Sequence, residues 1–158
     1  MFSRATALNG DISTWDVSRV TGMYGMFRGA TFLNGNISKR VVSRVKDMSD
    51  IFSSAKSSSS DISKWDVPCV TGRRRVASVT DMSDMFSRVT TSNGDISIRD
   101  VSRVTGMYGM FRSVTFFNIN ISKWVTSGVK DMIDIFSSAK ALSNDISKWD
   151  VSWVTGKR

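Results

Sequence analysis

Nearly the same stretch of sequence occurs twice in this chain of 158 residues. Residues 9–27 read NGDISTWDVSRVTGMYGMF, and residues 93–111 read NGDISIRDVSRVTGMYGMF. When residues 1–74 are aligned with residues 85–158, 55 of the 74 positions are identical. The chain is therefore a tandem duplication with copies at 1–84 and 85–158, and both copies must fit one fold.

A shorter period of 25 residues lies within each copy. It is marked by Phe2, Phe27, Phe52, Phe86, Phe111 and Phe136. The interval from Phe52 to Phe86 is 34 residues, one period plus nine, and we place a nine-residue insertion near 70–78. A fixed period of this length is typical of solenoids, whose coils bury their apolar sides against their neighbours. We therefore predict a single repeat solenoid over residues 1–158, with about six coils.

An apolar stripe recurs in the coils at constant spacing. In one coil it is Val45, Met48, Ile51, Phe52 and Ala55, with offsets of 0, 3, 6, 7 and 10. These offsets line one face of a helix, and the regular recurrence favours core packing over a cofactor site. The prediction is five short helices, centred near 21–30, 46–55, 80–89, 105–114 and 130–139.

Two kinds of polar residue support these helices. Thr21, Thr80 and Thr105 each follow the first valine of the stripe and are suited to cap a helix N-terminus. Between the stripe residues lie the pairs Asp47/Asp50, Asp81/Asp84 and Asp131/Asp134. Calcium needs six to eight oxygens, so a pair of carboxylates is too few for a site. We interpret the pairs as complements of the helix dipole and as solvated charges.

The other half of each coil resembles DISTWDVSRV, residues 11–20. Ile12, Trp15, Val17 and Val20 follow the L-x-x-L-x-L spacing of leucine-rich repeats, which predicts a short parallel strand with Trp15 and Val17 pointing inward. The expected strands lie near Trp15–Val17, Val41–Val42, Trp65–Val67, Asp100–Val101 and Trp149–Val151. The predicted fold class is thus α/β, a leucine-rich-repeat-like solenoid of about six 25-residue coils, each a short parallel strand plus a short helix.

A column of asparagines precedes these strands and has two interpretations. Its members are Asn9, Asn34, Asn93 and Asn118. Stacked side chains could satisfy the backbone of the next coil, or the residues could belong to simple turns. Both interpretations stay open at this point.

The composition excludes several classes of active site. The chain has no His, and all 14 acidic residues are Asp, so a Ser-His-Asp arrangement and a His metal site are impossible. Its single cysteine, Cys69, forms no internal disulfide and lacks the His partner of a catalytic thiolate. We therefore expect no enzyme activity and no cofactor.

Basic residues dominate the charge, with a formal net charge of +8 and a pI of about 10.1. If the strands align, one outward column contains Lys39, Lys64, Lys123 and Lys148, and another contains Arg19, Arg44 and Arg103. The insertion adds Arg73, Arg74 and Arg75. The lysine column and the three insertion arginines are the candidate polyanion contacts, and solvated surface charge is the alternative.

The motifs DIS-x-W-D-V, V-T-D-M and M-F stand at fixed spacing over nearly the whole chain. In this combination the chain resembles the 25-residue repeat of Mycoplasma-type surface lipoproteins, related to BspA-type leucine-rich-repeat surface proteins. The resemblance implies a cell-surface or extracellular module for adhesion or partner binding, with no defined site residues. Two coils depart from the pattern, because Arg40 and Arg99 stand where the other coils have Trp.

The expected function is therefore a non-enzymatic, surface-displayed module that binds a protein or glycan on another surface. The alternative is a basic solenoid that binds a polyanion or nucleic acid. No apolar run exceeds two residues, so we expect neither a membrane span nor a signal peptide in this chain. We also expect a segment of a longer array, and end-to-end association through uncapped coils.

Overall fold

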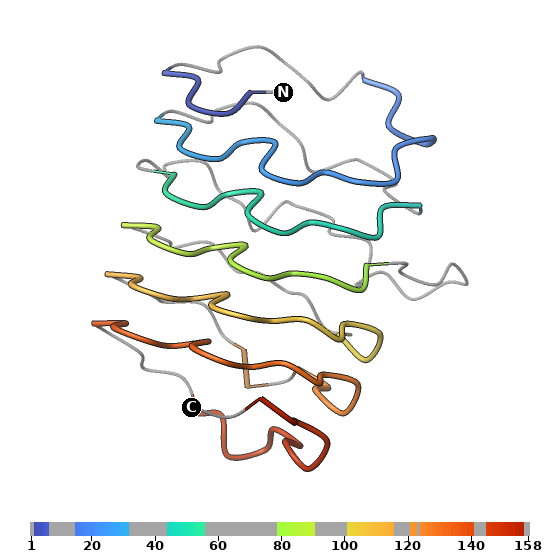
Figure 1. Cartoon of the computed structure of the whole chain (residues 1–158), viewed down its shortest axis with the longest axis vertical. Helices are drawn as coiled ribbons and strands as arrows, with labels where there is room; N and C mark the ends of the chain where they lie inside the picture. Colours follow the sequence, from blue (N-terminus) through green and yellow to red (C-terminus); the bar gives the residue numbers. More distant parts are fainter. Residues whose placement is uncertain are drawn as a thin grey trace.

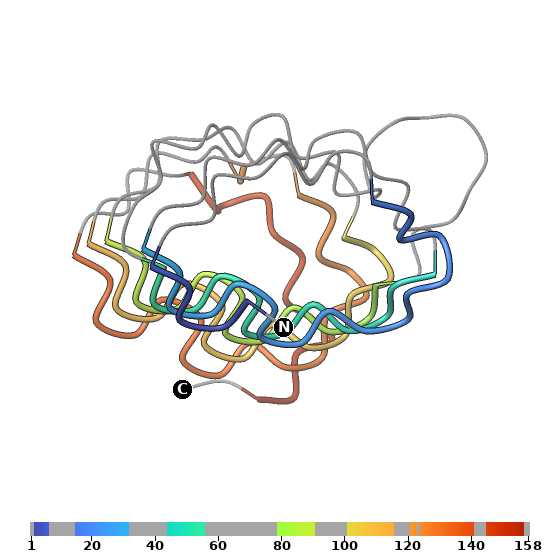
Figure 2. The same ribbon diagram turned by 90° about the horizontal axis from the view of Figure 1, so that it is seen from above.

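The computed structural model describes residues 2–6, 15–31, 44–55, 79–90, 101–115, 121–122, 124–140 and 145–156. These segments lie in successive coils that stack along the longest axis of the molecule (Figure 1). Seen from above, the turn segments of successive coils follow similar paths, each displaced a little from the one before (Figure 2). Each repeat of the sequence thus corresponds to one coil of the structure.

One column of backbone bridges joins the coils. Its parallel bridges connect Gly22, Asp47, Asp81, Gly106, Asp131 and Gly156 in that order. Asp47 pairs with Asp81 across 34 residues just as the other pairs do across 25, so the coil register is the same on both sides of the longer interval. The nine extra residues near 70–78 lie outside the described residues.

Backbone hydrogen bonds alternate between two kinds of partner along each coil. The N–H groups of Gly25 and Phe27 donate to Ser49 and Ile51 of the next coil, at 3.0 and 2.9 Å. The N–H of Met26 between them closes a tight turn onto Met23, at 3.2 Å. Every second residue is thus tied to the neighbouring coil, while the residues between them shape the turns.

The five predicted helices are wrong. Among the described residues there is no helix, and the segments predicted as helices are runs of turns. Two residues four positions apart have a left-handed backbone in each of these segments, for example Asp84 with φ 52° and Arg88 with φ 59°. Because L-residues continue a right-handed helix only at negative φ, these positions stop helix growth.

The strand predictions are wrong where they can be checked. Residues 15–17 and 149–151 contain no strand and no bridge. The bridge residues, apart from Gly156, lie instead inside the segments predicted as helices. Val101 is buried without being in a strand; Val41–Val42, Trp65–Val67 and Asp100 lie outside the described residues. The α/β solenoid built from a strand and a helix per coil is therefore overturned.

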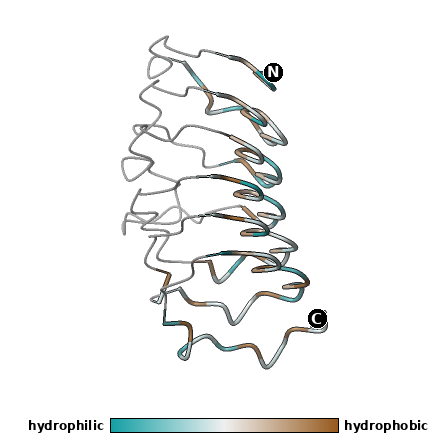
Figure 3. Cartoon of the chain, turned by 90° about the vertical axis from the view of Figure 1, so that its left-hand side faces the viewer, coloured by the Kyte–Doolittle hydropathy of each residue, from teal (hydrophilic) through white to brown (hydrophobic). Residues whose placement is uncertain are grey.

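The apolar stripe nevertheless forms the core. Val79, Met82, Met85, Phe86 and Val89 are all buried, so the offsets identified the inward positions although the backbone is not helical. Hydrophobic and hydrophilic positions recur in successive coils on this side of the molecule (Figure 3).

The six phenylalanines of the 25-residue period stack into one ladder through the core. Successive ring centroids are 5.7 to 6.1 Å apart, and the ring planes are within 21° of parallel. Trp124 and Trp149 stack beside this ladder at 6.0 Å, whereas Trp15 contacts Phe2 and remains 37% exposed. The ladder gives each coil its apolar contact with the next.

Candidate interaction face

Only one of the candidate polyanion contacts lies within the described residues. Lys148 is exposed. Hydrogen bonds from Ser147 lower the pKa of the nearby Asp145, and the charge of Lys148 contributes in the same direction. The remaining candidates, Lys39, Lys64, Lys123 and Arg73–Arg75, lie outside the described residues. The lysine column and the insertion therefore stay predictions.

Short Asx turns shape the polar side of the coils. In each, an Asp Oδ1 accepts a hydrogen bond of 2.9 or 3.0 Å from the backbone N–H two residues later. The pairs are Asp16 with Ser18, Asp47 with Ser49, Asp81 with Ser83, Asp131 with Ile133, Asp145 with Ser147 and Asp150 with Ser152. These carboxylates hold their own backbone and are not the helix-dipole complements that the sequence predicted.

Outward side chains of the turns form columns along the stack, and together these columns are the turn face. One column contains Tyr24, Ser49, Ser83, Tyr108 and Ile133, related by the same register as the bridges. Tyr24 is 61% exposed, whereas Tyr108 is half-buried. The face therefore presents two tyrosines separated by two coils that carry only serine in this column.

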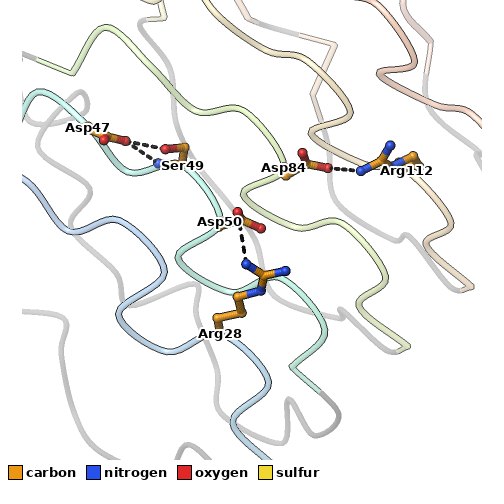
Figure 4. A network of polar contacts seen from close by, with 6 residues as sticks. All are labelled: Arg28, Asp47, Ser49, Asp50, Asp84 and Arg112. Carbon is orange, nitrogen blue, oxygen red and sulfur yellow. Dashed lines mark hydrogen bonds and ion pairs between the residues drawn. The ribbon is translucent and has the colours of Figure 1, made fainter. Parts of the chain in front are cut away.

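Two ion pairs cross between coils on the turn face (Figure 4). Arg112 donates from Nη2 to Asp84 Oδ1 of the preceding coil at 2.7 Å. Arg28 Nη1 lies 3.6 Å from Asp50 Oδ2 of the following coil. Both pairs are partly exposed, which limits what each contributes to stability.

The shorter of these ion pairs, between Arg112 and Asp84, is part of a small polar cluster. Arg112 also donates to the hydroxyl of Tyr108 at 3.3 Å, and its guanidinium lies 5.4 Å from the centre of the Tyr108 ring. Burial alone would lower the pKa of Arg112, but Asp84 and Tyr108 outweigh it, so the pKa is raised above its ordinary value. The guanidinium is held charged at this position.

Gly109, which has no side chain, leaves room for the ion pair between Arg112 and Asp84. Gly109 has φ +53°, and a Cβ added there would lie 2.7 Å from Asp84 Oδ1. Glycine at this position adopts the positive φ without steric cost and also leaves room for the carboxylate of the neighbouring coil.

The sequence carried a signal for these pairs that the helix interpretation missed. Coils with Gly at the first left-handed position have Arg three residues later, as in Gly25/Arg28 and Gly109/Arg112. Coils with Asp there have Ser instead, as in Asp50/Ser53, Asp84/Ser87 and Asp134/Ser137. Gly and Asp are also residues that adopt positive φ at low cost, so this alternation indicated turns as well as a charge partner between coils.

A second outward column lies where each coil turns a corner. Its described members are Arg19, Arg44, Arg103, Gly128 and Trp153, each two residues before a residue of the backbone ladder. The three arginines are exposed, and Trp153 is 69% exposed. The sequence predicted the arginines of this column as one outward row, but that prediction did not include Trp153.

The described residues contain no group of three or more side chains placed to bind a metal ion. They also contain no helix with the length and apolarity of a membrane span. The described surface offers repeated hydroxyl, carboxylate, guanidinium and aromatic groups on a hydrogen-bonded framework. Such groups can bind a partner through several weak contacts at once.

Comparison with known proteins supports the repeat interpretation. Neither a curated protein nor a solved structure matches the chain. One family matches twice, over residues 1–76 and 72–158, and its description is "Mycoplasma protein of unknown function, DUF285". The two matches cover the two copies of the duplication, and the chain belongs to this family.

Proposed function

We propose that the chain is a non-enzymatic, surface-displayed repeat module that binds a protein or glycan on another surface in adhesion. The observation that carries the proposal is the coil-to-coil backbone ladder, which displays an outward row of polar side chains in each coil. An extended array of equivalent groups is suited to binding through many contacts. On the motifs DIS-x-W-D-V, V-T-D-M and M-F, we further propose kinship with the repeat of BspA-type surface proteins.

Two measurements test this proposal. Antibodies raised against the chain should label intact cells of the source organism as strongly as permeabilised cells. Fluorescently labelled chain should bind to a monolayer of epithelial cells with saturation, and unlabelled chain should compete. Labelling only after permeabilisation would contradict surface display, and binding that does not saturate would contradict adhesion.

A matched variant connects adhesion to the turn face. Tyr24→Ser replaces an outward residue of this face by the residue that the neighbouring coil carries in the same column, Ser49. We expect an unchanged melting temperature and weaker cell binding. Unchanged cell binding by this variant would exclude the turn face from adhesion.

The second candidate function is binding of a polyanion or nucleic acid. The observation that favours it is the exposed corner column of Arg19, Arg44 and Arg103 in a chain of net charge +8. Nucleic-acid binding would show a steep dependence on salt.

A further inference from the structure

The corner column differs from the turn face because its cations have no carboxylate partner among the described residues. On the turn face, Arg28 and Arg112 form ion pairs with Asp50 and Asp84. The corner arginines form no ion pair with a described carboxylate. Nearby carboxylates such as Asp47 and Asp150 accept hydrogen bonds from their own backbone. Among the described residues, no carboxylate thus competes with an external anion for the corner guanidiniums.

The backbone fixes the spacing of these cations. Lys46 N–H donates to Thr21 O at 2.8 Å, and Thr105 N–H donates to Thr80 O at 2.9 Å, two residues after Arg44 and Arg103 respectively. This ladder holds Arg19 and Arg44 on adjacent coils and places Arg103 two coils further on. Lys46 and Lys130 are exposed on the ladder itself and add two cations to the same corner.

Trp153 occupies in the last described coil the position that Arg19, Arg44 and Arg103 occupy in earlier coils. Gly128 lies between Arg103 and Trp153, and a Cβ added there would lie 2.0 Å from the carbonyl oxygen of Ser102. The column therefore combines a row of cations with one exposed aromatic ring at its end. We call Arg19, Arg44, Lys46, Arg103, Lys130 and Trp153 the corner ridge.

We infer that the corner ridge binds a sulfated polysaccharide, with guanidiniums on sulfate groups and Trp153 on the apolar face of a sugar ring. Arginine suits this role because its planar fork donates two parallel hydrogen bonds to an oxyanion. Nucleic acid fits less well, since binding of single strands relies on several aromatic side chains that stack successive bases, and the ridge has one. This inference rests on the proposed function and names the chemistry of its partner.

The test is isothermal titration calorimetry, in which the whole chain is titrated with a heparin dodecasaccharide. The ridge variant is Arg19→Ser/Arg44→Ser/Arg103→Ser. The matched control is Arg4→Ser/Arg88→Ser/Lys140→Thr, which removes three exposed cations and introduces residues that other coils carry in those columns, Ser54, Ser113 and Thr115. Both variants lower the net charge equally.

We expect the ridge variant to bind the dodecasaccharide about 10- to 100-fold more weakly, as the loss of three exposed charge contacts predicts. The control should lose less than about threefold, because only nonspecific attraction changes. Trp153→Ser should weaken binding several-fold without changing the salt dependence. Thermal melts check that all three variants remain folded.

Three results would overturn the inference. Equal losses in the ridge variant and the control would show that net charge alone attracts the glycan. A single-stranded oligonucleotide of equal charge that binds more tightly than the glycan would assign the ridge to nucleic acid. Absence of glycan binding in the wild-type chain would also overturn it, whereas the cell-surface labelling and cell-binding experiments would still decide the proposed adhesion function.

Discussion

At the scale of single residues, the left-handed backbone positions decide the fold. Each complete turn segment has two of them, four residues apart, occupied by Gly, Asp, Ser or Arg. An L-residue there costs about 1–2 kcal/mol relative to glycine, and Asp reduces this cost because its side chain bonds locally. These positions convert an apolar spacing typical of a helix into a series of turns.

Substitutions at three glycines separate the effect of a positive φ from the effect of a close contact with the neighbouring coil. Gly109→Ala combines φ +53° with a Cβ only 2.7 Å from Asp84, so we expect a loss of about 2–4 kcal/mol in the free energy of unfolding. Gly25→Ala has φ +55° but ordinary contacts, and should lose about 1–2 kcal/mol. Gly22→Ala has neither problem and serves as the control. Urea denaturation measures all three, and equal losses would contradict this explanation.

At the scale of the repeated element, each coil consists of hydrogen-bonded turns rather than a strand and a helix. The corner turns close by bonds such as Val104 N–H to Val101 O at 2.9 Å and Val154 N–H to Val151 O at 3.2 Å. The Asx turn that begins one corner is reinforced by the Ser152 hydroxyl, which donates to Asp150 Oδ1 at 2.6 Å. Side chains and backbone thus close the corner together.

The Asp150 corner gives a prediction about pH. Hydrogen bonds from the hydroxyl and the backbone N–H of Ser152 lower the pKa of Asp150 below its ordinary value. A carboxyl with a lowered folded-state pKa stabilises the fold above its unfolded-state pKa, and this stabilisation is lost as the pH falls through the folded-state pKa. Ser152→Ala should therefore raise the pKa of Asp150 toward its ordinary value.

Carboxyl chemical shifts measured by NMR from neutral to acidic pH test this expectation. Asp145, whose pKa is lowered by Ser147 in the same way, is an internal reference that should not move in the Ser152→Ala variant. If both carboxyls shifted together, a general loss of structure would explain the result better than the loss of one hydrogen bond.

Sequence reasoning reached the repeat, the buried positions of the apolar stripe and the coil register, but not the conformation of the coil or the exposure of Trp15. The spacing of Val45, Met48, Ile51 and Phe52 correctly identified buried residues, because burial at repeated positions does not depend on which backbone repeats. Spacing could not distinguish a helix from turns, since both place these side chains on one side. The restriction of one column to Gly or Asp, at Gly25, Asp50, Asp84, Gly109 and Asp134, carried that information.

The candidate site was less predictable than the core. Arg19, Arg44 and Arg103 could be assigned to one column from the period alone, because register follows from spacing. The pair of Arg112 with Asp84 depends on which neighbouring coil the guanidinium reaches, and Arg28 reaches the opposite way to Asp50. Sequence spacing contains no information on that direction.

At the scale of the whole molecule, stability is a sum over neighbouring coils. In a stacked repeat each unit contacts only the units beside it, so a local defect has a local effect. The phenylalanine ladder makes this testable because its members differ in coverage. Phe111 is fully buried and stacks on Phe86 and Phe136 at 5.8 and 5.7 Å. Phe2 is half-buried and, among the described phenylalanines, stacks on Phe27.

Phe111→Ala should therefore lower the free energy of unfolding by about 3–5 kcal/mol, as for other buried aromatic residues. Phe2→Ala should cost less, because that ring is partly exposed and has one stacked phenylalanine neighbour. Amide hydrogen exchange adds the spatial test: in Phe111→Ala, protection should fall first in residues 82–88 and 132–138, whose coils stack on Phe111, and least in residues 23–29. Uniform loss of protection along the whole chain would show instead that the coils unfold as one cooperative unit, with the ladder transmitting the defect from end to end.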